Sequence, residues 1–385
     1  MALSFPHPTT SSSRATTSHN RRRLNNDDHH QPLLPGLPDD IAQLCLSRVP
    51  PSTLYSVCRS WRRVIYTSDF PAFLSLYTIS SDQNSALQVS CFDPISSEWK
   101  AVTQPPHLNN VRLRHHSFIS RNFSVQSLSV AGNLVLLAGT SGYLEPALSN
   151  PLIFNPLSET WSSGPPFLNP RRWCSAGVSR AAVVVASGIG SRYNLTVARS
   201  VDKWVLPETN LHNKKCKISN GVWKKMQSLK DSKFSREAID SVGCKGKLFM
   251  VNGKGTCVKQ GAVYDVDSDQ WSEMPAEMLS GWKGPAAALD EEVIYMVDEC
   301  KGILKKYDDL MKLWVDVLED KMLKGADHIV AGGGRVCVVR DGGVGILVVD
   351  VTSSSPPRLS VLDTPVGEQV LRLHILPRMC SPEFE

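Results

Sequence analysis

The sequence predicts two folded parts in series, a small all-α unit followed by a larger all-β propeller. Two observations support this. Between residues 37 and 66, apolar side chains recur at intervals of three and four, the spacing of one helix face. Beyond residue 73 that spacing ends, and short runs of β-favouring residues alternate with Gly, Pro, Asn and Asp. Several of these runs belong to a unit that recurs along the chain, which is typical of a propeller.

The helical segment is Leu37–Tyr66, LPDDIAQLCLSRVPPSTLYSVCRSWRRVIY. Pro38 stands in the first turn of the first predicted helix, and two aspartates follow it at the positive end of the helix dipole. Pro50 and Pro51 end that helix, and the Ser-Thr pair after them can cap the next one. A unit below about 40 residues usually needs a staple or a partner. The segment is therefore either a cap on the larger domain or a docking unit.

The order of residues, L-P-x-D-I-x-x-x-x-L-x-R-V-P, then L, then V-C-R-S-W-R, resembles the F-box motif. Cys45 and Cys58 depart mildly from it, at positions that vary in the family. The resemblance implies that an exposed apolar face docks the Skp adaptor, which joins the chain to a cullin-based ubiquitin ligase. The residues implied in that contact are Leu37, Pro38, Ile41, Leu46, Val49, Pro50, Leu54, Val57 and Trp61. We expect their apolar side chains to be exposed in the isolated chain, because the partner supplies the missing core.

The β-rich part contains a repeated turn. F-D-P-I-S-S-E-W starts at Phe92, F-N-P-L-S-E-T-W at Phe154, Y-D-V-D-S-D-Q-W at Tyr264 and Y-D-D-L-M-K-L-W at Tyr307; a fifth copy is stretched by an insertion between Trp204 and Trp223. The pattern predicts a strand that ends at the aromatic residue, a turn closed by the Asp or Asn side chain, and a strand that begins at the Trp. A Trp at a fixed register can then pack between neighbouring sheets.

Upstream of each aromatic residue lie a strand of small residues, a turn and an apolar strand, as in VQSLSVAGNLVLLAG. Small residues suit the innermost strand, where sheets converge on an axis. The Trp residues that end the five repeated turns, Trp99, Trp161, Trp223, Trp271 and Trp314, lie 62, 62, 48 and 43 positions apart. Over about residues 74–376 these units resemble kelch repeats, whose period is about 50 residues and whose fold is a propeller with four strands per blade.

Counting the units gives six blades. Five full units begin near Ser124, Cys174, Ala238, Pro285 and His328. A sixth, over residues 74–102, lacks an innermost strand, and the alternating segment Glu368–Leu376 has no blade of its own. We expect this last strand to complete the first blade and close the ring, which removes the open edge.

The predicted organisation is a Ser/Thr/Arg-rich tail over residues 1–33, an F-box over 34–72, a kelch-type propeller over 73–378 and a short tail over 379–385. The composition of the first tail favours a disordered, solvated segment. Its first 26 residues contain no acid and four arginines, so a transit peptide and a nuclear signal stay open as alternatives. Since an F-box inside an organelle would lack its adaptor, we expect the protein in the cytoplasm, the nucleus or both.

Composition argues against several function classes. The net charge of +5 is small for this length, so nucleic acid is not an expected partner, and no apolar run approaches the ~18 residues of a membrane span. Ten cysteines without a C-x-x-C pair or a Cys/His cluster favour reduced thiols and no zinc. His115 and His116 stand among arginines, where an exposed basic loop is favoured over a metal site. We expect no cofactor and no catalytic residues.

Propellers bind partners with loops at one rim, and aromatic and Arg residues there are the usual makings of a binding hot spot. The residues expected at such a rim are Tyr143, Arg172, Trp173, Arg192, Tyr193, Arg236, Trp282, Lys283 and His328. Alternatively, Trp173 and Trp282 pack between blades. The basic insertion over residues 205–222 is expected to be a flexible loop whose role stays open.

The combined resemblance implies the substrate-recognition adaptor of a Skp–cullin–F-box (SCF) ubiquitin ligase. The propeller would hold an unidentified protein, whose lysines a partner enzyme ubiquitinates, while this chain catalyses nothing. One alternative is a scaffold unrelated to degradation. The other is a propeller enzyme: some kelch propellers are copper oxidases, but their site needs two Tyr and two His around the axis, and the repeats here offer no such set.

Overall fold

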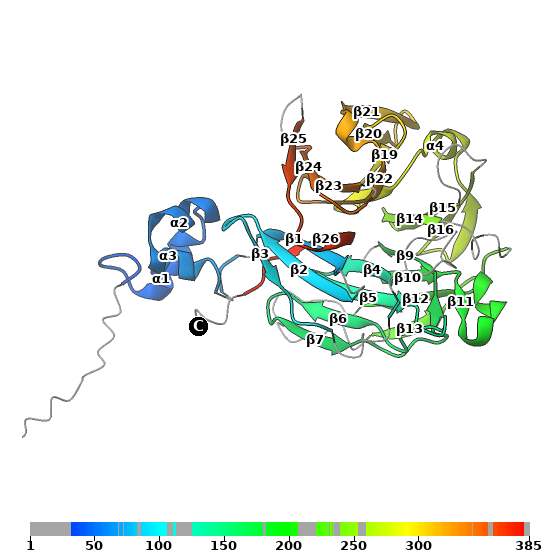
Figure 1. Ribbon diagram of the computed structural model, residues 1–385, viewed down its shortest axis with the longest axis horizontal. Coiled ribbons are helices and arrows are strands. Elements are labelled where there is room, and N and C mark those ends of the chain that lie inside the picture. The colour runs from blue at the N-terminus through cyan, green and yellow to red at the C-terminus, as the bar shows by residue number, and fades with distance from the viewer. Residues whose placement is uncertain are drawn as a thin grey trace, which may run out of the picture.

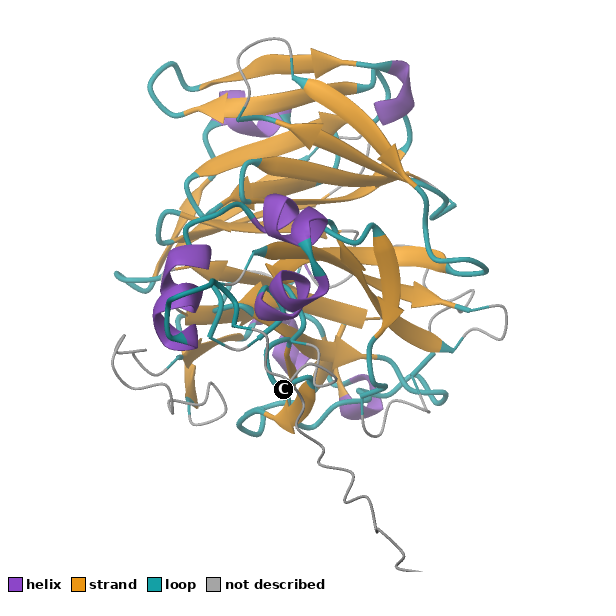
Figure 2. Ribbon diagram, turned by 90° about the vertical axis from the view of Figure 1, so that its left-hand side faces the viewer, coloured by secondary structure: helices purple, strands orange, loops and turns teal. Residues whose placement is uncertain are grey.

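The computed structural model describes residues 32–67, 69–71, 73–82, 86–105, 111–112, 125–179, 182–206, 221–230, 232, 234, 239–252, 259–340, 342–352 and 357–380. Within these ranges a helical unit lies beside a ring of β-sheets (Figure 1). Figure 2 shows the same helices in front of the strands of the ring. No helix in the described part of the chain is long and apolar enough to cross a membrane.

Three short helices form the helical unit: α1 (Asp39–Leu46), α2 (Pro51–Val57) and α3 (Arg59–Val64). Proline shapes two of the helix starts, since Pro38 and Pro50 are the N-cap residues of α1 and α2 and Pro51 occupies the first position of α2. The unit has a small core of its own, made by Leu46, Leu54, Val64, Ile65, Tyr66 and Phe70.

Six four-stranded antiparallel sheets form the blades. Given from the innermost strand outward, blade 1 consists of β26 (Gln369–Pro377), β1 (Leu74–Ser81), β2 (Leu87–Asp93) and β3 (Glu98–Ala101), and blade 2 of β4 (Val125–Val130), β5 (Asn133–Gly139), β6 (Leu152–Asn155) and β7 (Thr160–Ser163). Blade 3 consists of β9 (Ser175–Ser179), β10 (Ala182–Ala186), β12 (Val201–Val205) and β13 (Val222–Lys225), and blade 4 of β14 (Ile239–Cys244), β15 (Lys247–Asn252), β16 (Gln260–Asp265) and β17 (Gln270–Glu273). Blade 5 consists of β18 (Ala286–Leu289), β19 (Val293–Asp298), β20 (Ile303–Asp308) and β21 (Leu313–Glu319), and blade 6 of β22 (Ala326–Gly332), β23 (Arg335–Arg340), β24 (Ile346–Asp350) and β25 (Arg358–Leu362).

The remaining elements lie in the connections. They are a two-stranded ribbon of β8 (Arg171–Arg172) and β11 (Ile189–Gly190), the 3-10 helices η2 (Ser191–Tyr193), η3 (Leu195–Arg199) and η6 (Lys321–Leu323), and the helix α4 (Ala276–Gly281).

The ring closes as the sequence predicted. The last strand, β26, pairs antiparallel with β1, from Leu74 opposite Pro377 to Ser81 opposite Gln369. Each innermost strand contacts the innermost strands of the two neighbouring blades, and β22 contacts β26 at the closing point. The six-bladed propeller and its closure by the C-terminal strand are therefore confirmed.

The repeated turns have the predicted construction. In each of the four full copies the Asp or Asn carboxyl or amide oxygen accepts backbone N–H bonds from residues two or three positions ahead; Asn155, for example, accepts from Leu157 and Ser158. The aromatic residue and the Trp face each other across the strand pair, as Phe154 and Trp161 do with ring centroids 5.2 Å apart. The Asp or Asn side chain therefore accepts hydrogen bonds from turn N–H groups that have no backbone carbonyl partner in the tight turn.

The tryptophans also join the blades. Each of five indole N–H groups donates to a backbone carbonyl of the loop that follows the preceding blade; the donor–acceptor pairs are Trp99–Asp363, Trp161–Thr103, Trp223–Pro165, Trp271–Gln227 and Trp314–Met278. In blade 6 the register-equivalent position, opposite Val349, is Leu359, whose side chain has no N–H to donate. The contact between blades 5 and 6 therefore depends on apolar packing without this hydrogen bond.

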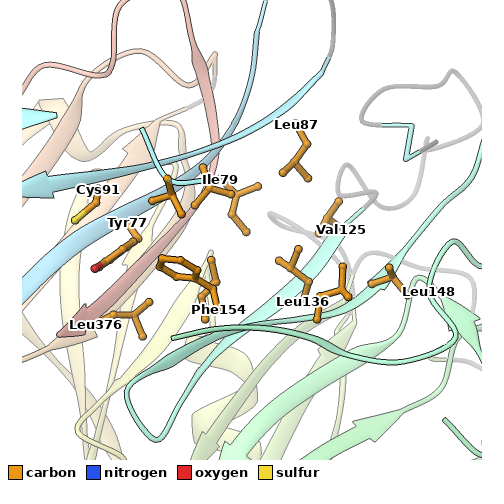
Figure 3. Close-up of a cluster of buried hydrophobic side chains, with 13 residues drawn as sticks. Tyr77, Ile79, Leu87, Cys91, Val125, Leu136, Leu148, Phe154 and Leu376 are labelled. Carbon is orange, nitrogen blue, oxygen red and sulfur yellow. The ribbon is translucent and has the colours of Figure 1, made fainter. Parts of the chain in front are cut away.

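Apolar side chains fill the space between adjacent blades. Figure 3 shows the cluster between blades 1 and 2, where Tyr77, Leu376 and Phe154 come together although they are far apart in sequence. Equivalent clusters occupy the other five spaces around the ring. The core is thus a circle of interblade layers, and the innermost strand of blade 1 contributes to two of them, through Leu376 and Leu373.

Candidate protein-interaction surfaces

The helical unit exposes one apolar row. Leu37, Ile41 and Leu44 lie three and four positions apart along α1 and its entry, and their side chains are 40%, 44% and 63% exposed. Ile41 and Leu44 share one face of α1 and Leu37 precedes the helix, while Ala42 and Leu46 are buried on another face. We call Leu37, Ile41 and Leu44 the apolar row. Val57 at the end of α2 is exposed as well.

The nine F-box positions divide into three groups. Leu37, Pro38, Ile41, Pro50 and Val57 are exposed, and Val49 and Trp61 are half-buried. The indole N–H of Trp61 donates to the Leu33 carbonyl at 2.9 Å, which ties the N-terminal approach to α3.

The expected exposure is wrong for Leu46 and Leu54, which are buried in the core of the helical unit. The reason is that three helices and the segment after them already enclose a small core around these two leucines. They support the surface rather than form it.

The helical unit contacts blade 1 through its last residues. The Tyr66 hydroxyl donates to the Asp93 carboxylate in the turn between β2 and β3, and Ile95 of that turn packs against the helical core. Burial, followed by the hydrogen bond to Asp93, raises the Tyr66 pKa, so the phenol keeps its proton. Lys100 of β3 places its ammonium 5.3 Å from the centre of the Tyr66 ring.

The propeller has two unlike faces, because antiparallel strands alternate in direction. One face, here called the turn face, carries the hairpin turns between first and second strands and the repeated Asp/Asn turns. The opposite face, here called the loop face, carries the connections between second and third strands and those between blades. Since β1 begins at the turn face, the helical unit joins the propeller there.

All the predicted rim residues that are described belong to connections or strand ends of the loop face. Tyr143 is 92% exposed, Arg192 is exposed, and Lys283 and His328 are half-buried. The Glu145 carboxylate accepts from the Arg192 backbone N–H at 2.8 and 2.9 Å, which holds the connections of blades 2 and 3 together. Tyr143 and Arg192 are therefore presented from two loops that are bonded to each other.

Two rim predictions are wrong. Arg172 and Trp282 are fully buried and cannot meet a partner. Arg172 lies in the β8–β11 ribbon and stacks on Trp173, its guanidinium carbon 4.0 Å from the ring centre, while Trp282 packs edge-to-face against Trp314 at 5.7 Å. The alternative of packing between blades is correct for Trp282, and Trp173 is half-buried.

Some predictions fall outside the described residues. They concern Arg236, the side chain of Tyr193, the pair His115 and His116, most of the basic insertion, and the first and last residues of the chain.

The loop face also exposes apolar residues that the sequence analysis missed: Leu168, Val344 and Val366. Val344 stands among glycines, and Val366 lies between a proline and a glycine, a context in which a valine has few neighbours to pack against. The Val370 N–H donates to the Gly343 carbonyl at 3.1 Å, which places the connections carrying these two valines side by side. An apolar residue inside a Gly/Pro-rich loop was the feature of the sequence that could have predicted these exposed side chains.

The innermost strands carry polar groups that are held by the fold. His374 of β26 has the Ser127 and Ser129 hydroxyls at 2.9 and 3.2 Å from its two ring nitrogens. Burial, and then the nearby Arg372 guanidinium, lower the His374 pKa to about 3, so the ring is neutral at pH 7. His328 accepts the Leu373 N–H at 3.3 Å, and burial lowers its pKa as well.

The described residues contain no group of three or more His, Cys, Asp or Glu side chains that could hold a metal ion. The arrangement as a whole presents two separate surfaces, an apolar row on α1 and a loop face of exposed Tyr, Arg, Leu and Val side chains. Surfaces of this composition suit protein partners.

Comparison with known proteins agrees with this reading. No family model matches the chain. It is 45% identical over 367 residues to the F-box/kelch-repeat protein SKIP25 of Arabidopsis thaliana, and the aligned region covers 91% of each chain. It is 24% identical over 323 residues to the F-box/kelch-repeat protein SKIP4 of the same plant, covering 80% of this chain and 82% of the relative. The F-box protein AFR, also from Arabidopsis thaliana, is 24% identical over 381 residues, covering 89% and 93%.

Proposed function

This chain belongs to the F-box/kelch-repeat family, and from that premise we propose that it is the substrate-recognition adaptor of an SCF ubiquitin ligase. In this proposal α1–α3 bind the Skp adaptor and, through it, cullin. The propeller binds the protein that is to be ubiquitinated, and this chain supplies no catalytic group. We propose that it acts in the cytoplasm, the nucleus or both, where such ligases work.

The observation that carries the proposal is the apolar row. Three large aliphatic side chains are exposed, Ile41 and Leu44 on α1 and Leu37 just before it, although the same unit buries Leu46 and Leu54. Covering an exposed aliphatic side chain stabilises a complex by up to about 1.5–3 kcal/mol. A partner that covers the whole row therefore gains several kcal/mol, enough to decide whether it binds.

The loop face supports the second half of the proposal. Tyr143 and Arg192 are of the types that dominate binding hot spots, and the exposed valines of blade 6 and the closing connection extend the surface. The helical unit joins the opposite face, so a target bound at the loop face leaves the apolar row free.

Co-purification tests the proposal. Wild-type chain expressed in plant cells should recover Skp and cullin, and the variant Leu37→Ala/Pro38→Ala/Ile41→Asp should recover neither. Leu310→Asp is the control, because Leu310 is an apolar residue on a blade 5 turn that is even more exposed and lies outside the helical unit. Recovery of Skp without cullin would favour a scaffold unrelated to degradation, and recovery of both by the triple variant would refute the assignment of the docking surface.

The target can be sought with the same triple variant. Since it should not deliver its target to the ligase, proximity labelling with it should enrich proteins that the wild type depletes. Adding Tyr143→Ala and Arg192→Ala should remove those proteins from the labelled set if the loop face binds them, while an unchanged set would place target binding elsewhere.

A further inference from the structure

The residue directly after the closing strand lies at the junction of the two parts of the chain. Arg378 follows β26 and is only 1% exposed. One guanidinium nitrogen, Nη2, donates to the Thr67 carbonyl at 2.5 Å and to the Phe70 carbonyl at 3.4 Å. Both carbonyls belong to the segment that joins α3 to β1. Residues some 310 positions apart in sequence are thereby held together.

The backbone and the ring system add to this contact. The Arg378 N–H donates to the Phe73 carbonyl at 2.9 Å, so the pairing of β26 continues beyond the sheet. The guanidinium carbon lies 5.7 Å from the centre of the Phe73 ring, and that ring meets the Tyr66 ring edge-on at 6.4 Å. Arg378 therefore contacts the connecting segment in three ways: its backbone N–H and its guanidinium donate hydrogen bonds, and its guanidinium lies near the Phe73 ring.

The burial of this charge favours the position in which the helical unit lies against blade 1. Among the described residues, the guanidinium has carbonyl oxygens and the Cys380 sulfur as hydrogen-bond partners rather than a carboxylate. The buried Nε–H has no partner among the described residues, so the stability of the buried cation depends on the contacts of Nη1 and Nη2. If the helical unit swung away, the carbonyls of Thr67 and Phe70 would leave, and the charge would be exposed or unpaired.

A second contact prevents rotation about the first. The Tyr66 hydroxyl donates a hydrogen bond to Asp93 at the end of β2. Arg378, just after β26, donates hydrogen bonds to the connecting segment. These two points lie on different strands of blade 1. A body that is held at two separated points, and whose apolar core also packs against Ile95, has little freedom to turn.

We propose that Arg378 is a positioning residue that locks the helical unit onto blade 1, so that the apolar row and the loop face keep one fixed separation and orientation. Two domains of one chain move relative to each other by default unless their interface prevents it. Here the interface depends on a residue at the far end of the chain. The inference rests on the proposed function only for what the two surfaces bind; the rigidity itself does not depend on it.

Electron–electron distance measurements on the full-length chain test the proposal. Exposed Cys45 on α1 and exposed Cys300 in the β19–β20 turn carry the spin labels, and Cys58, Cys216 and Cys257 are replaced by serine to avoid further labelling. The wild type should give one narrow distance distribution. Arg378→Met keeps the apolar stem and removes the donors, and it should widen the distribution about twofold or more.

Trp161→Phe is the matched control. It removes the hydrogen bond to Thr103 at the boundary between blades 1 and 2 but leaves the connecting segment untouched, so it should lower stability without widening the distribution. If Arg378→Met does not fold, Arg378→Lys replaces it, because lysine keeps the charge but its single nitrogen cannot replace both Nη2, which contacts Thr67 and Phe70, and Nη1, which contacts Met379 and Cys380. A broad wild-type distribution, or a variant as narrow as the wild type, would overturn the proposal. Neither result needs Skp or cullin, so this failure is distinct from a failed co-purification.

Discussion

Leu376 offers the sharpest test of how the ring is held closed. It lies on β26 opposite Ser75, is 1% exposed, and packs with Tyr77 and Phe154 between blades 1 and 2. Figure 3 shows these three side chains converging. Leu376→Ala removes the packing and leaves every backbone hydrogen bond of the closing strand available. The variant therefore measures the side-chain share of closure alone.

The magnitude follows from burial. A fully buried leucine that becomes alanine loses its transfer free energy and leaves a cavity, together about 2–5 kcal/mol. The surroundings of Leu376 include the large rings of Tyr77 and Phe154, both fully buried and paired with each other at 6.4 Å. Because rings held this way cannot easily collapse into a gap, we expect about 3–4 kcal/mol, a large part of a typical total stability of about 5–15 kcal/mol.

Guanidinium unfolding followed by far-ultraviolet circular dichroism measures the effect. The midpoint should fall while the slope stays unchanged, since the same surface is exposed on unfolding. Leu310→Ala is the control, because Leu310 is 95% exposed, and should stay within about 0.5 kcal/mol of wild type. Deleting residues 366–385 should abolish cooperative unfolding altogether. A loss below about 1 kcal/mol for Leu376→Ala, or a deletion that melts like the full chain, would refute this account of closure.

Three further predictions follow from the boundaries between blades, the helical unit and the innermost strands. Trp161→Phe should cost about 1–2 kcal/mol in the same unfolding assay, because the bond to Thr103 is lost while the aromatic contact with Phe154 persists; no loss would mean that the indole N–H contributes nothing. Ile41→Asp should weaken Skp binding, measured by calorimetry, at least about 30-fold, or about 2 kcal/mol, and leave the melting curve unchanged. Leu54→Ala should instead lower the melting temperature of the helical unit, because Leu54 is buried in its core. The reverse pattern would contradict the roles assigned to these two residues. The folded-state pKa of His374, about 3, lies below the unfolded value of about 6.5, so the stability due to its neutral state is present above pH 6.5 and is lost as the pH falls toward 3, at about 1.4 kcal/mol per pH unit. Unfolding midpoints from about pH 7 to pH 5 should fall less steeply for His374→Gln than for wild type, and equal slopes would refute the depressed pKa.

The propeller was predictable because its information is local and repeated. The spacing from Phe154 to Trp161 specifies a strand, a turn closed by Asn155 and a second strand, and the same spacing returns in other blades. Once units are counted, an unpaired first blade and a spare last strand leave one arrangement without an open edge. The closing pair of β1 and β26 was thus deducible although its members are about 300 residues apart.

The surfaces were harder to predict, because burial depends on how elements meet. Leu46 and Ile41 are similar aliphatic residues on one short helix, and only the packing of α1 against the other helices decides that the first is buried and the second is not. Trp282 has the residue type of a hot spot, yet the T-shaped contact with Trp314 conceals it. Arg378 gave no sequence signal, since its partners become neighbours only after the ring closes.

The closing strand also has a consequence for how the chain is made. The ribosome releases the helical unit before the strands and β26 after all other strands of the ring, so blade 1 stays without its innermost strand, and Thr67 and Phe70 without Arg378, until those residues have been made. During that interval β1 presents an unpaired edge and Tyr77 an uncovered face, both of which favour association with other nascent chains. The apolar row, in contrast, is complete early. In the proposed function, the surface for the adaptor is therefore made before the ring that would hold a target can close.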